Sequence, residues 1–304
     1  MHIPDGFLDA KTSLATTILA CGGLAVALRH ARLTLPARKV PLLGLSAAFV
    51  FAAQMVNFPV GAGTSGHLLG GTLAAVLLGP SAAVIVLGAV LIVQCLMLAD
   101  GGITAWGANV FNMAMVGGVV GWMVFEAVKK GLGTMPGMSE KGRLVTAAVV
   151  AAWVSTVLSA VACAGELAAS GTVAWKLALP AMAGVHAIIG IGEAAITGLA
   201  LSAIASVRPE LVLERGEAMR GGAMKAGMVY GGLITAGLVL FVAPFASKLP
   251  DGMEQTAGRL GFLERARETV AGLPANVWTG LLGMVAVAFV MVVLMRVVVK
   301  SRQE

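Results

Sequence analysis

The sequence predicts an all-α membrane protein: a seven-helix transmembrane bundle with an inserted N-terminus, followed by a two-helix C-terminal module. Of the 304 residues, 58% are hydrophobic and 12% are charged, whereas a soluble domain carries about 25% charged residues. The apolar residues form long stretches separated by short polar breaks, which is typical of helices that cross a bilayer repeatedly. The basic residues gather in alternate breaks, and this pattern predicts the orientation of the chain.

Nine apolar spans are expected along the chain. They cover residues 12–28, 40–56, 68–79, 81–98, 107–128, 144–165, 176–206, 227–246 and 277–299. The third is short, because about 20 residues are needed to cross a bilayer core. We therefore expect it to lie against protein or to form one arm of a tight hairpin with the fourth span. In the fifth span, the pattern GGVVG (117–121) predicts a close approach of another helix, either of this chain or of another membrane subunit.

The basic residues predict that the N-terminus lies outside and the C-terminus inside. If the chain starts outside, the breaks 57–67 and 99–106 are also outside, and they contain no Lys or Arg. Most of the basic residues then lie inside, as the positive-inside rule requires. These are Arg29, Arg32, Arg38, Lys39, Lys129, Lys130, Lys141, Arg143, Arg208, Arg215, Arg220, Lys225, Arg296, Lys300 and Arg302. The net charge of +6 is thus explained by membrane orientation and does not indicate a nucleic-acid partner.

The chain divides near residue 226. Residues 1–226 contain seven spans with short outside breaks, and residues 227–304 contain two spans around a polar outside loop at 247–276. That loop is long enough to form a small helix outside the membrane.

Four polar stretches interrupt this apolar chain: the N-terminus MHIPDGFLD, residues 57–71, residues 94–113 and residues 186–197. Polar residues inside a membrane are costly and are often functional. The first three stretches lie at the outer face, while His186 and Glu193 are seven residues apart on one face of the seventh span. The four stretches meet only if the N-terminus folds back into the bundle, and the Pro and Gly of HIPDG permit that reversal.

The first two residues can chelate a metal ion. The terminal amine of Met1, the backbone nitrogen of His2 and His2 Nδ1 would form two fused chelate rings in one plane, provided that the amide loses its proton. A distant imidazole would complete a square, and His67 in its glycine-rich loop is the best candidate. Square-planar nitrogen donation favours Ni(II) or Cu(II) over Zn(II), Mg(II) or Ca(II). No signal-peptide core precedes Met1, and the large second residue disfavours removal of the initiator, so we expect a free amine at Met1.

The four stretches resemble the substrate-capture subunit of nickel and cobalt energy-coupling-factor transporters, the CbiM/NikM family. The resemblance covers about residues 1–210 and rests on MHIPDGFLD, NFPVGAGTSGHLLGG, ADGGITAWGANVFNM and HAIIGIGEAAIT. It implies a seven-helix bundle with the N-terminus inserted and the metal held by Met1, His2 and His67. It also implies a supporting polar shell, for which the candidates are Asn57, Gln94, Asn109, Asn112, His186 and Glu193.

Residues 227–304 resemble the two-helix accessory module of such systems, the PDGLE or NikN-like type. LPDGMEQTA matches the PDGLE signature except that Met253 replaces leucine, a volume-conserving exchange. In related systems the accessory loop touches the capture subunit from outside, so this loop is expected to influence access of the metal.

The resemblance implies a transporter subunit in the cytoplasmic membrane of a bacterium or archaeon, with Ni²⁺ favoured and Co²⁺ next as the transported substrate. The sequence contains no P-loop motif, so ATP hydrolysis is expected in separate CbiO/NikO-like subunits, linked through a CbiQ/NikQ-like transmembrane coupling subunit. Three alternatives remain open at this point: an ion-coupled secondary metal transporter that uses His186 and Glu193 as a proton relay, a membrane enzyme with the same pair as acid and base, and a receptor that binds without transport.

Overall fold

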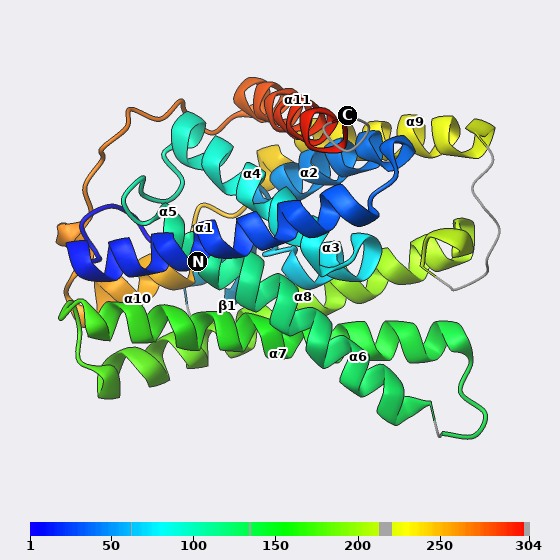
Figure 1. Cartoon of the computed structure of the whole chain (residues 1–304). Coiled ribbons are helices and arrows are strands. Elements are labelled where there is room, and N and C mark those ends of the chain that lie inside the picture. The colour runs from blue at the N-terminus through cyan, green and yellow to red at the C-terminus, as the bar shows by residue number, and fades with distance from the viewer. Residues whose placement is uncertain (62, 134, 213–220, 301–304) are drawn as a thin grey trace.

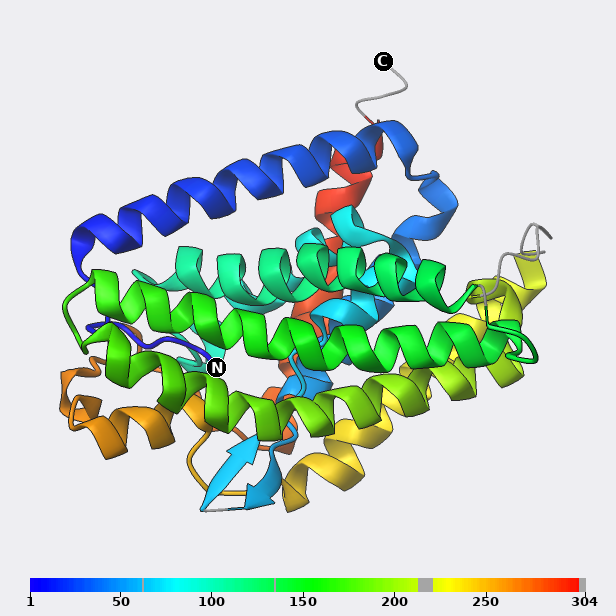
Figure 2. The same ribbon diagram turned by 90° about the horizontal axis from the view of Figure 1, so that it is seen from below.

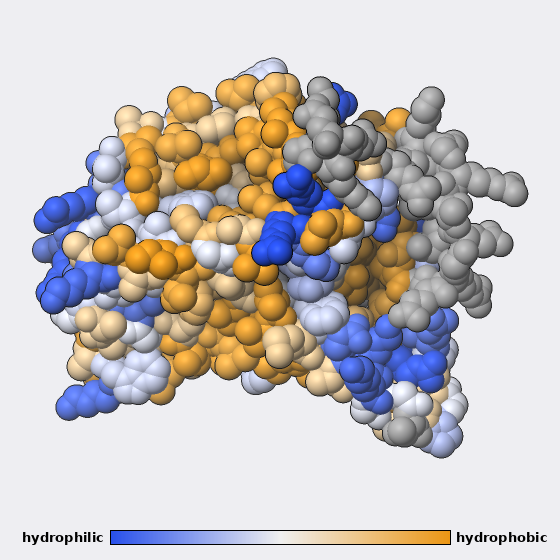
Figure 3. Space-filling view, viewed as in Figure 1, coloured by the Kyte–Doolittle hydropathy of each residue, from blue (hydrophilic) through white to orange (hydrophobic). Residues whose placement is uncertain are grey.

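The computed structural model describes residues 1–304 except 62, 134, 213–220 and 301–304. Long helices lie side by side in one bundle (Figures 1 and 2). Residues 1–9 and a short helix at residues 252–260 lie at one end of the bundle, and a β-hairpin lies on its flank nearer that end (Figure 2). We call this the hairpin end. On the face that Figure 3 shows, hydrophobic residues cover most of the middle of the molecule, and most of the hydrophilic side chains lie toward its ends. This distribution suits a protein that spans a bilayer.

The elements follow the predicted spans closely. The first part of the chain forms α1 (Ala10–Thr34), α2 (Val40–Gln54), β1 (Phe58–Gly61), β2 (Thr64–Gly66), α3 (Gly71–Leu78) and α4 (Pro80–Leu98). It continues with α5 (Trp106–Val110), the π-helical η2 (Phe111–Val120), α6 (Gly121–Leu132), α7 (Glu140–Ala169) and α8 (Trp175–Val207). The remainder forms α9 (Gly221–Gly237), η4 (Leu238–Val242), α10 (Gly252–Leu260) and α11 (Val277–Lys300). Short 3₁₀ turns occur at η1 (Ala37–Lys39), η3 (Pro209–Leu211), η5 (Ala243–Phe245) and η6 (Leu263–Arg265).

Within the described residues, seven helices are long and apolar enough to cross a membrane. The chain is therefore a multi-pass membrane protein. The predicted number of nine spans is not confirmed, because α2 has 15 residues and α3 has 8, fewer than the roughly 20 that a crossing needs. The orientation of the chain in the membrane and the division near residue 226 stay predictions. Of the basic residues used for orientation, Arg215, Arg220 and Arg302 lie outside the described residues.

The short third span, which forms α3, lies against protein as expected. Residues 71–75 of α3 are buried, and α3 packs against both α4 and η2. The non-helical chain between β2 and α3 carries His67 through Gly70, all of which are buried. Non-helical backbone at this depth is tolerated because protein surrounds it.

The loop predicted at 57–67 is instead an antiparallel hairpin, in which Phe58 pairs with Gly66. Its hydrogen bonds tie residues 58–61 to residues 64–66. The hairpin therefore fixes the position at which His67 leaves it.

The C-terminal helices pack on the first seven spans. Helix α11 contacts α2 and α4, α9 contacts α2, and α10 contacts α8. The small helix expected in the loop 247–276 is confirmed as α10. Asp251 starts it with a capping box: its side chain accepts hydrogen bonds from the N–H groups of Met253 and Glu254, and the Glu254 side chain accepts from the Asp251 N–H.

A close backbone contact holds α3 in place, and it provides a test of the fold. A Cβ atom built on Gly71 would lie 2.6 Å from the carbonyl carbon of Gly117 and 2.7 Å from the Met113 oxygen. This contact is the close approach that the GGVVG pattern predicted. Backbone atoms cannot move away as a flexible side chain could. We therefore expect Gly71→Ala to lower the free energy of unfolding by about 1–3 kcal/mol, as overpacking does.

Thermal unfolding in detergent measures this effect, with Gly22→Ala in α1 as the matched control. A Cβ on Gly22 meets nothing within 4 Å, and Ala favours a helix over Gly, so that variant should unfold at or slightly above the temperature of the parent. Equal unfolding temperatures for the two variants would contradict the packing of α3.

Candidate metal centre

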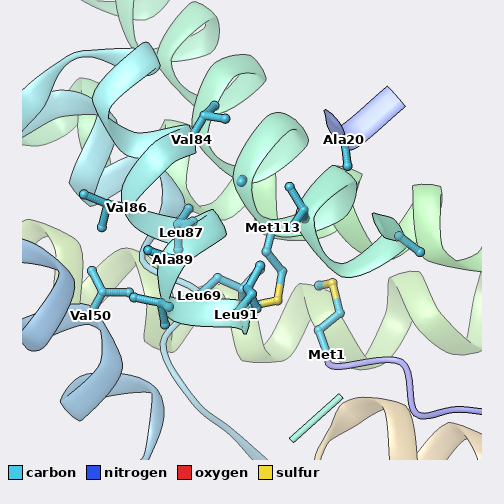
Figure 4. Packing of buried hydrophobic residues seen from close by; sticks show 14 of the residues in the cluster. Met1, Ala20, Val50, Leu69, Val84, Val86, Leu87, Ala89, Leu91 and Met113 are labelled. Atoms are coloured by element: carbon cyan, nitrogen blue, oxygen red, sulfur yellow. The ribbon is translucent and has the colours of Figure 1, made fainter. Parts of the chain in front are cut away.

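The first residues of the chain are buried rather than solvated. Met1, Ile3 and Phe7 are 3%, 0% and 1% exposed. The Met1 side chain joins the apolar cluster that contains Leu91 and Met113 (Figure 4). Burial of an apolar side chain of this size contributes about 1.5–3 kcal/mol, so these three residues anchor the N-terminal segment to the bundle.

Side-chain hydrogen bonds satisfy the buried backbone of this segment. Asn109 accepts from the Ile3 N–H at 2.8 Å and donates to the Ile3 carbonyl at 3.1 Å. The same carbonyl accepts from the Gly102 N–H at 2.9 Å. The Asp5 carboxylate accepts from the N–H and the hydroxyl of Thr104. Burial raises the pKa of Asp5, but the hydrogen bonds outweigh it and leave that pKa below its usual value.

The loop between α10 and α11 covers the N-terminal segment from the other side. The Arg267 N–H donates to the Asp5 carbonyl at 2.8 Å, and the Phe7 ring meets the Phe262 ring edge-on with centroids 5.0 Å apart. Residues 1–9 therefore lie between the helix bundle and the C-terminal loop. Both views place the N-terminus inside the outline of the molecule (Figures 1 and 2).

The terminal amine lies beside His67. The Met1 nitrogen is 3.1 Å from His67 Nε2, and His67 Nδ1 is 3.0 Å from the Leu68 carbonyl. Because a carbonyl only accepts, Nδ1 carries the proton of the neutral ring and Nε2 presents its lone pair toward the amine. Burial, reinforced by the positive amine and by His2, lowers the pKa of His67 to about 3. The imidazole is thus neutral near pH 7, as a metal ligand must be.

The His2 ring stacks on the His67 ring, with centroids 5.1 Å apart and planes 13° apart. His2 Nδ1 lies 2.9 Å from Asp100 Oδ1, and His2 Nε2 is buried without a partner. Burial raises the pKa of Asp100, but His2 outweighs it and the pKa falls below its usual value. The nitrogen that the predicted chelate uses therefore faces Asp100, and chelation through it requires the ring to turn.

Asp251, the first residue of the capping box, reaches the same place from the C-terminal loop. Its Oδ2 atom is 2.7 Å from the Met1 amine and 3.9 Å from His67 Nε2. Burial raises the pKa of this carboxyl, but the positive amine and then His67 outweigh it and hold the pKa well below its usual range. The carboxylate is therefore ionised and neutralises the buried amine.

Helix α8 supports the site through two polar residues. The Glu193 carboxylate accepts from the Leu69 N–H at 2.6 Å and from the Gly70 N–H at 2.9 Å, which fixes the chain just after His67. His186 donates from Nδ1 to the Met182 carbonyl at 2.8 Å. Its other nitrogen, Nε2, has no partner. His186 lines a narrow crevice together with Met1, Gly66, His67, Leu69, Ile189, Asp251 and Gly252.

The structure therefore brings together most of the residues expected at the site. Met1, His2 and His67 converge; Asn109 and Glu193 hold the segments that carry them, and His186 lines the crevice. Three others have no such contact. Asn112 donates to Glu166 Oε2 at 2.7 Å, both side-chain polar atoms of Gln94 are buried without partners, and so is Asn57 Oδ1. The metal-ligating role of Met1, His2 and His67 stays a prediction.

Asp100 and Asp251 were missed as site residues. Both occur in stretches that the sequence singled out, ADGGITAWGANVFNM and LPDGMEQTA. In the part of the chain that the structure describes, no group of three or more His, Cys, Asp or Glu side chains is arranged to hold a metal ion.

A family model, CbiM, described as the cobalt uptake substrate-specific transmembrane region, matches residues 2–211. The chain belongs to this family. A putative fused nickel transport protein NikMN from Archaeoglobus fulgidus is 39% identical over 217 residues, which cover 71% of this chain and 69% of that relative. The fused nickel transport protein NikMN of Rhodobacter capsulatus is 36% identical over 226 residues, covering 71% of this chain and 65% of the relative.

A crystal structure of a truncated transition metal transporter superposes with a TM-score of 0.60 at 32% identity, covering 68% of this chain and 99% of that one. Together with the family model, these similarities make this CbiM-family chain a metal-transport protein rather than an enzyme.

Asn109 offers a test of the site that leaves every predicted ligand in place. Removing its amide in Asn109→Ala leaves the Ile3 N–H buried without a partner and weakens the hold on the Ile3 carbonyl, which costs about 1–3 kcal/mol. We expect metal affinity, measured by isothermal titration with Ni(II), to fall roughly tenfold or more. Asn57→Ala is the control, since no hydrogen bond from its side chain holds the segment, and equal affinities in the two variants would contradict this role of Asn109.

Proposed function

We propose that this CbiM-family chain captures a divalent transition-metal ion, with Ni²⁺ favoured and Co²⁺ next, as the substrate-binding subunit of an energy-coupling-factor transporter. The observation that carries the proposal is the 3.1 Å approach of the Met1 amine to His67 Nε2 inside the protein. A planar chelate needs several nitrogen donors close together. The imidazole lone pair of His67, the terminal amine of Met1 and the backbone nitrogen of His2 can provide them.

The proposed ligands are the Met1 amine, the backbone nitrogen and Nδ1 of His2, and His67 Nε2. The ion would reach them from the outer face, with the hairpin end of the bundle taken to be outside. Binding replaces one proton on the amine and one on the amide, and the His2 ring turns from Asp100 toward the ion. His67 needs no deprotonation, because its pKa of about 3 keeps it neutral.

Release toward the cytoplasm requires energy from partners. We assign that role to a CbiQ/NikQ-like transmembrane coupling subunit and CbiO/NikO-like ATPase subunits in a bacterial or archaeal cytoplasmic membrane. We assign residues 227–304 to a fused NikN-like module, which is supported by the fused nickel transport relatives and by the contact of Asp251 with the site.

Nickel is favoured over cobalt for a chemical reason. A planar set of strong nitrogen donors suits low-spin Ni(II), whereas other divalent ions prefer tetrahedral or oxygen-rich surroundings. The two relatives named as fused NikMN proteins are also described as nickel transport proteins.

The alternative of an ion-coupled secondary transporter finds less support. His186 and Glu193 would have to exchange a proton, yet each is bonded to backbone: His186 to Met182, and Glu193 to Leu69 and Gly70. These contacts suit structural support of the site better than a relay between the two side chains.

The chelating amine is tested by adding one glycine before Met1. Such an extension keeps every side chain but replaces the amine by an amide, which cannot act as the same donor. We expect Ni(II) and Co(II) binding, measured by equilibrium dialysis of the purified protein, to fall by at least about a hundredfold, equivalent to roughly 2.7 kcal/mol.

Two histidine variants complete this experiment. His67→Ala should lose binding as the extension does, whereas His30→Ala should keep it, because His30 is exposed on α1. Retained affinity in the extended protein would reject the site.

Proton release gives an independent check of the ligand set. Because the amine and the amide each lose a proton while His67 is already neutral, binding of one Ni(II) near pH 7 should release about two protons, and affinity should rise with pH. Calorimetric titration in buffers of different ionisation enthalpy measures this number. Release of fewer than about one proton would exclude a deprotonated amide as a ligand.

A further inference from the structure

The most unexpected contact at the site comes from the far end of the chain. Asp251 lies 250 residues from Met1, yet its Oδ2 atom is 2.7 Å from the amine. The contact is buried on the amine side, where the Met1 side chain is 0% exposed, and Asp251 itself is 15% exposed. A buried ammonium group without a partner would be strongly unfavourable, so this carboxylate is what allows the terminus to lie inside the protein.

Asp251 is held rigidly in front of the amine. Its Oδ1 atom accepts from the N–H groups of Met253 and Glu254, both at 2.8 Å, which leaves Oδ2 for the amine. The preceding residues are fixed to the hairpin, since the Ser65 N–H donates to the Pro250 carbonyl at 2.9 Å. The Ser65 hydroxyl donates to the Leu249 carbonyl at 2.7 Å.

The residue after Asp251, Gly252, packs so closely that a side chain could not be accommodated there. A Cβ atom on Gly252 would lie 2.8 Å from His186 Cε1 and 2.8 Å from Ile189 Cδ1. The segment 249–252 therefore docks directly on α8 and on the hairpin, at the mouth of the crevice that contains Met1 and His67.

We propose that Asp251 is a positioning residue for the chelating amine of Met1, and that it stays paired with that amine both before and after the metal ion binds. The C-terminal segment then supplies part of the metal site itself. This inference rests on the proposed function, since it names a further residue of the same site.

Charge balance explains why the ion pair between Asp251 and the Met1 amine need not break when the metal ion binds. The free terminus carries a single positive charge as an ammonium group. A divalent ion adds two positive charges, and loss of one proton from the amine and one from the His2 amide removes two. The chelate therefore carries the same net charge as the free terminus, and a coordinated amine still has two N–H bonds to donate to Asp251. A carboxylate that merely competed with the ion would instead have to leave.

The variant Asp251→Asn tests this role with little change of shape. Asn is as good an N-cap as Asp, so its Oδ1 atom can keep both hydrogen bonds that start α10. Its amide nitrogen, however, meets the amine donor to donor. Glu254→Gln is the matched control, because it removes a carboxylate from the same capping box while leaving the amine contact intact.

Two measurements separate this inference from the proposed function. The first is the rate at which the terminal amine is acylated by an N-hydroxysuccinimide ester in protein stripped of metal by a chelator, followed by mass spectrometry of the N-terminal peptide. The second is the affinity for Ni(II). We expect Asp251→Asn to expose the amine, raising acylation severalfold, and to weaken Ni(II) binding roughly tenfold or more, the cost of losing a hydrogen bond to a charged group. Glu254→Gln should match the parent in both.

Three outcomes overturn the inference. Tighter Ni(II) binding by Asp251→Asn would show that the carboxylate competes with the ion, and unchanged acylation would show that it does not hold the amine. Unchanged affinity with increased acylation would show that placement of the amine by Asp251 is unnecessary for binding. If the parent protein binds no metal, the proposed function fails, while the acylation comparison still decides whether Asp251 holds the amine.

Discussion

The fold depends on keeping a charged chain terminus inside the protein. Met1 places its side chain in the apolar core and its amine against Asp251 and His67. Such burial is unfavourable unless the charge and the backbone groups find partners. Asp251 neutralises the charge, and Asn109 satisfies both backbone groups of Ile3. Two distant parts of the chain, the C-terminal loop and the fifth span, are thus required to hold nine residues at the N-terminus.

The same constraint explains the irregular third span. A continuous helix would satisfy its own backbone and would leave His67 on a helix face. The chain is instead non-helical from His67 to Gly70, where Gly70 takes a positive φ of 78°, and the Leu69 and Gly70 N–H groups donate to Glu193 before α3 begins. His67 Nε2 then lies 3.1 Å from the Met1 amine. Non-helical backbone of this kind is not tolerated in contact with lipid; here it is buried, α3 packs against α4 and η2, and β2 packs against α8.

The sequence predicted those features that local patterns encode. Long apolar stretches predicted the seven long helices, and the length of residues 68–79 alone indicated an enclosed segment. The meeting of Met1, His2 and His67 was predicted from a family resemblance combined with the chelating chemistry of the first two residues. Asp100 and Asp251 escaped prediction because ion pairs across such separations leave no periodic signal. Asn57, Gln94 and Asn112 were expected to support the site, but a polar residue in or beside a span does not specify which way its side chain points.

The central claim is that the terminal amine and two imidazoles, together with one backbone nitrogen, form the metal-binding set. X-ray absorption spectroscopy at the nickel edge of the Ni(II)-loaded protein tests it most directly, because edge shape reports coordination geometry and the extended fine structure reports ligand type. The account predicts a square-planar spectrum with nitrogen neighbours only and with imidazole scattering. A six-coordinate spectrum dominated by oxygen neighbours would contradict it.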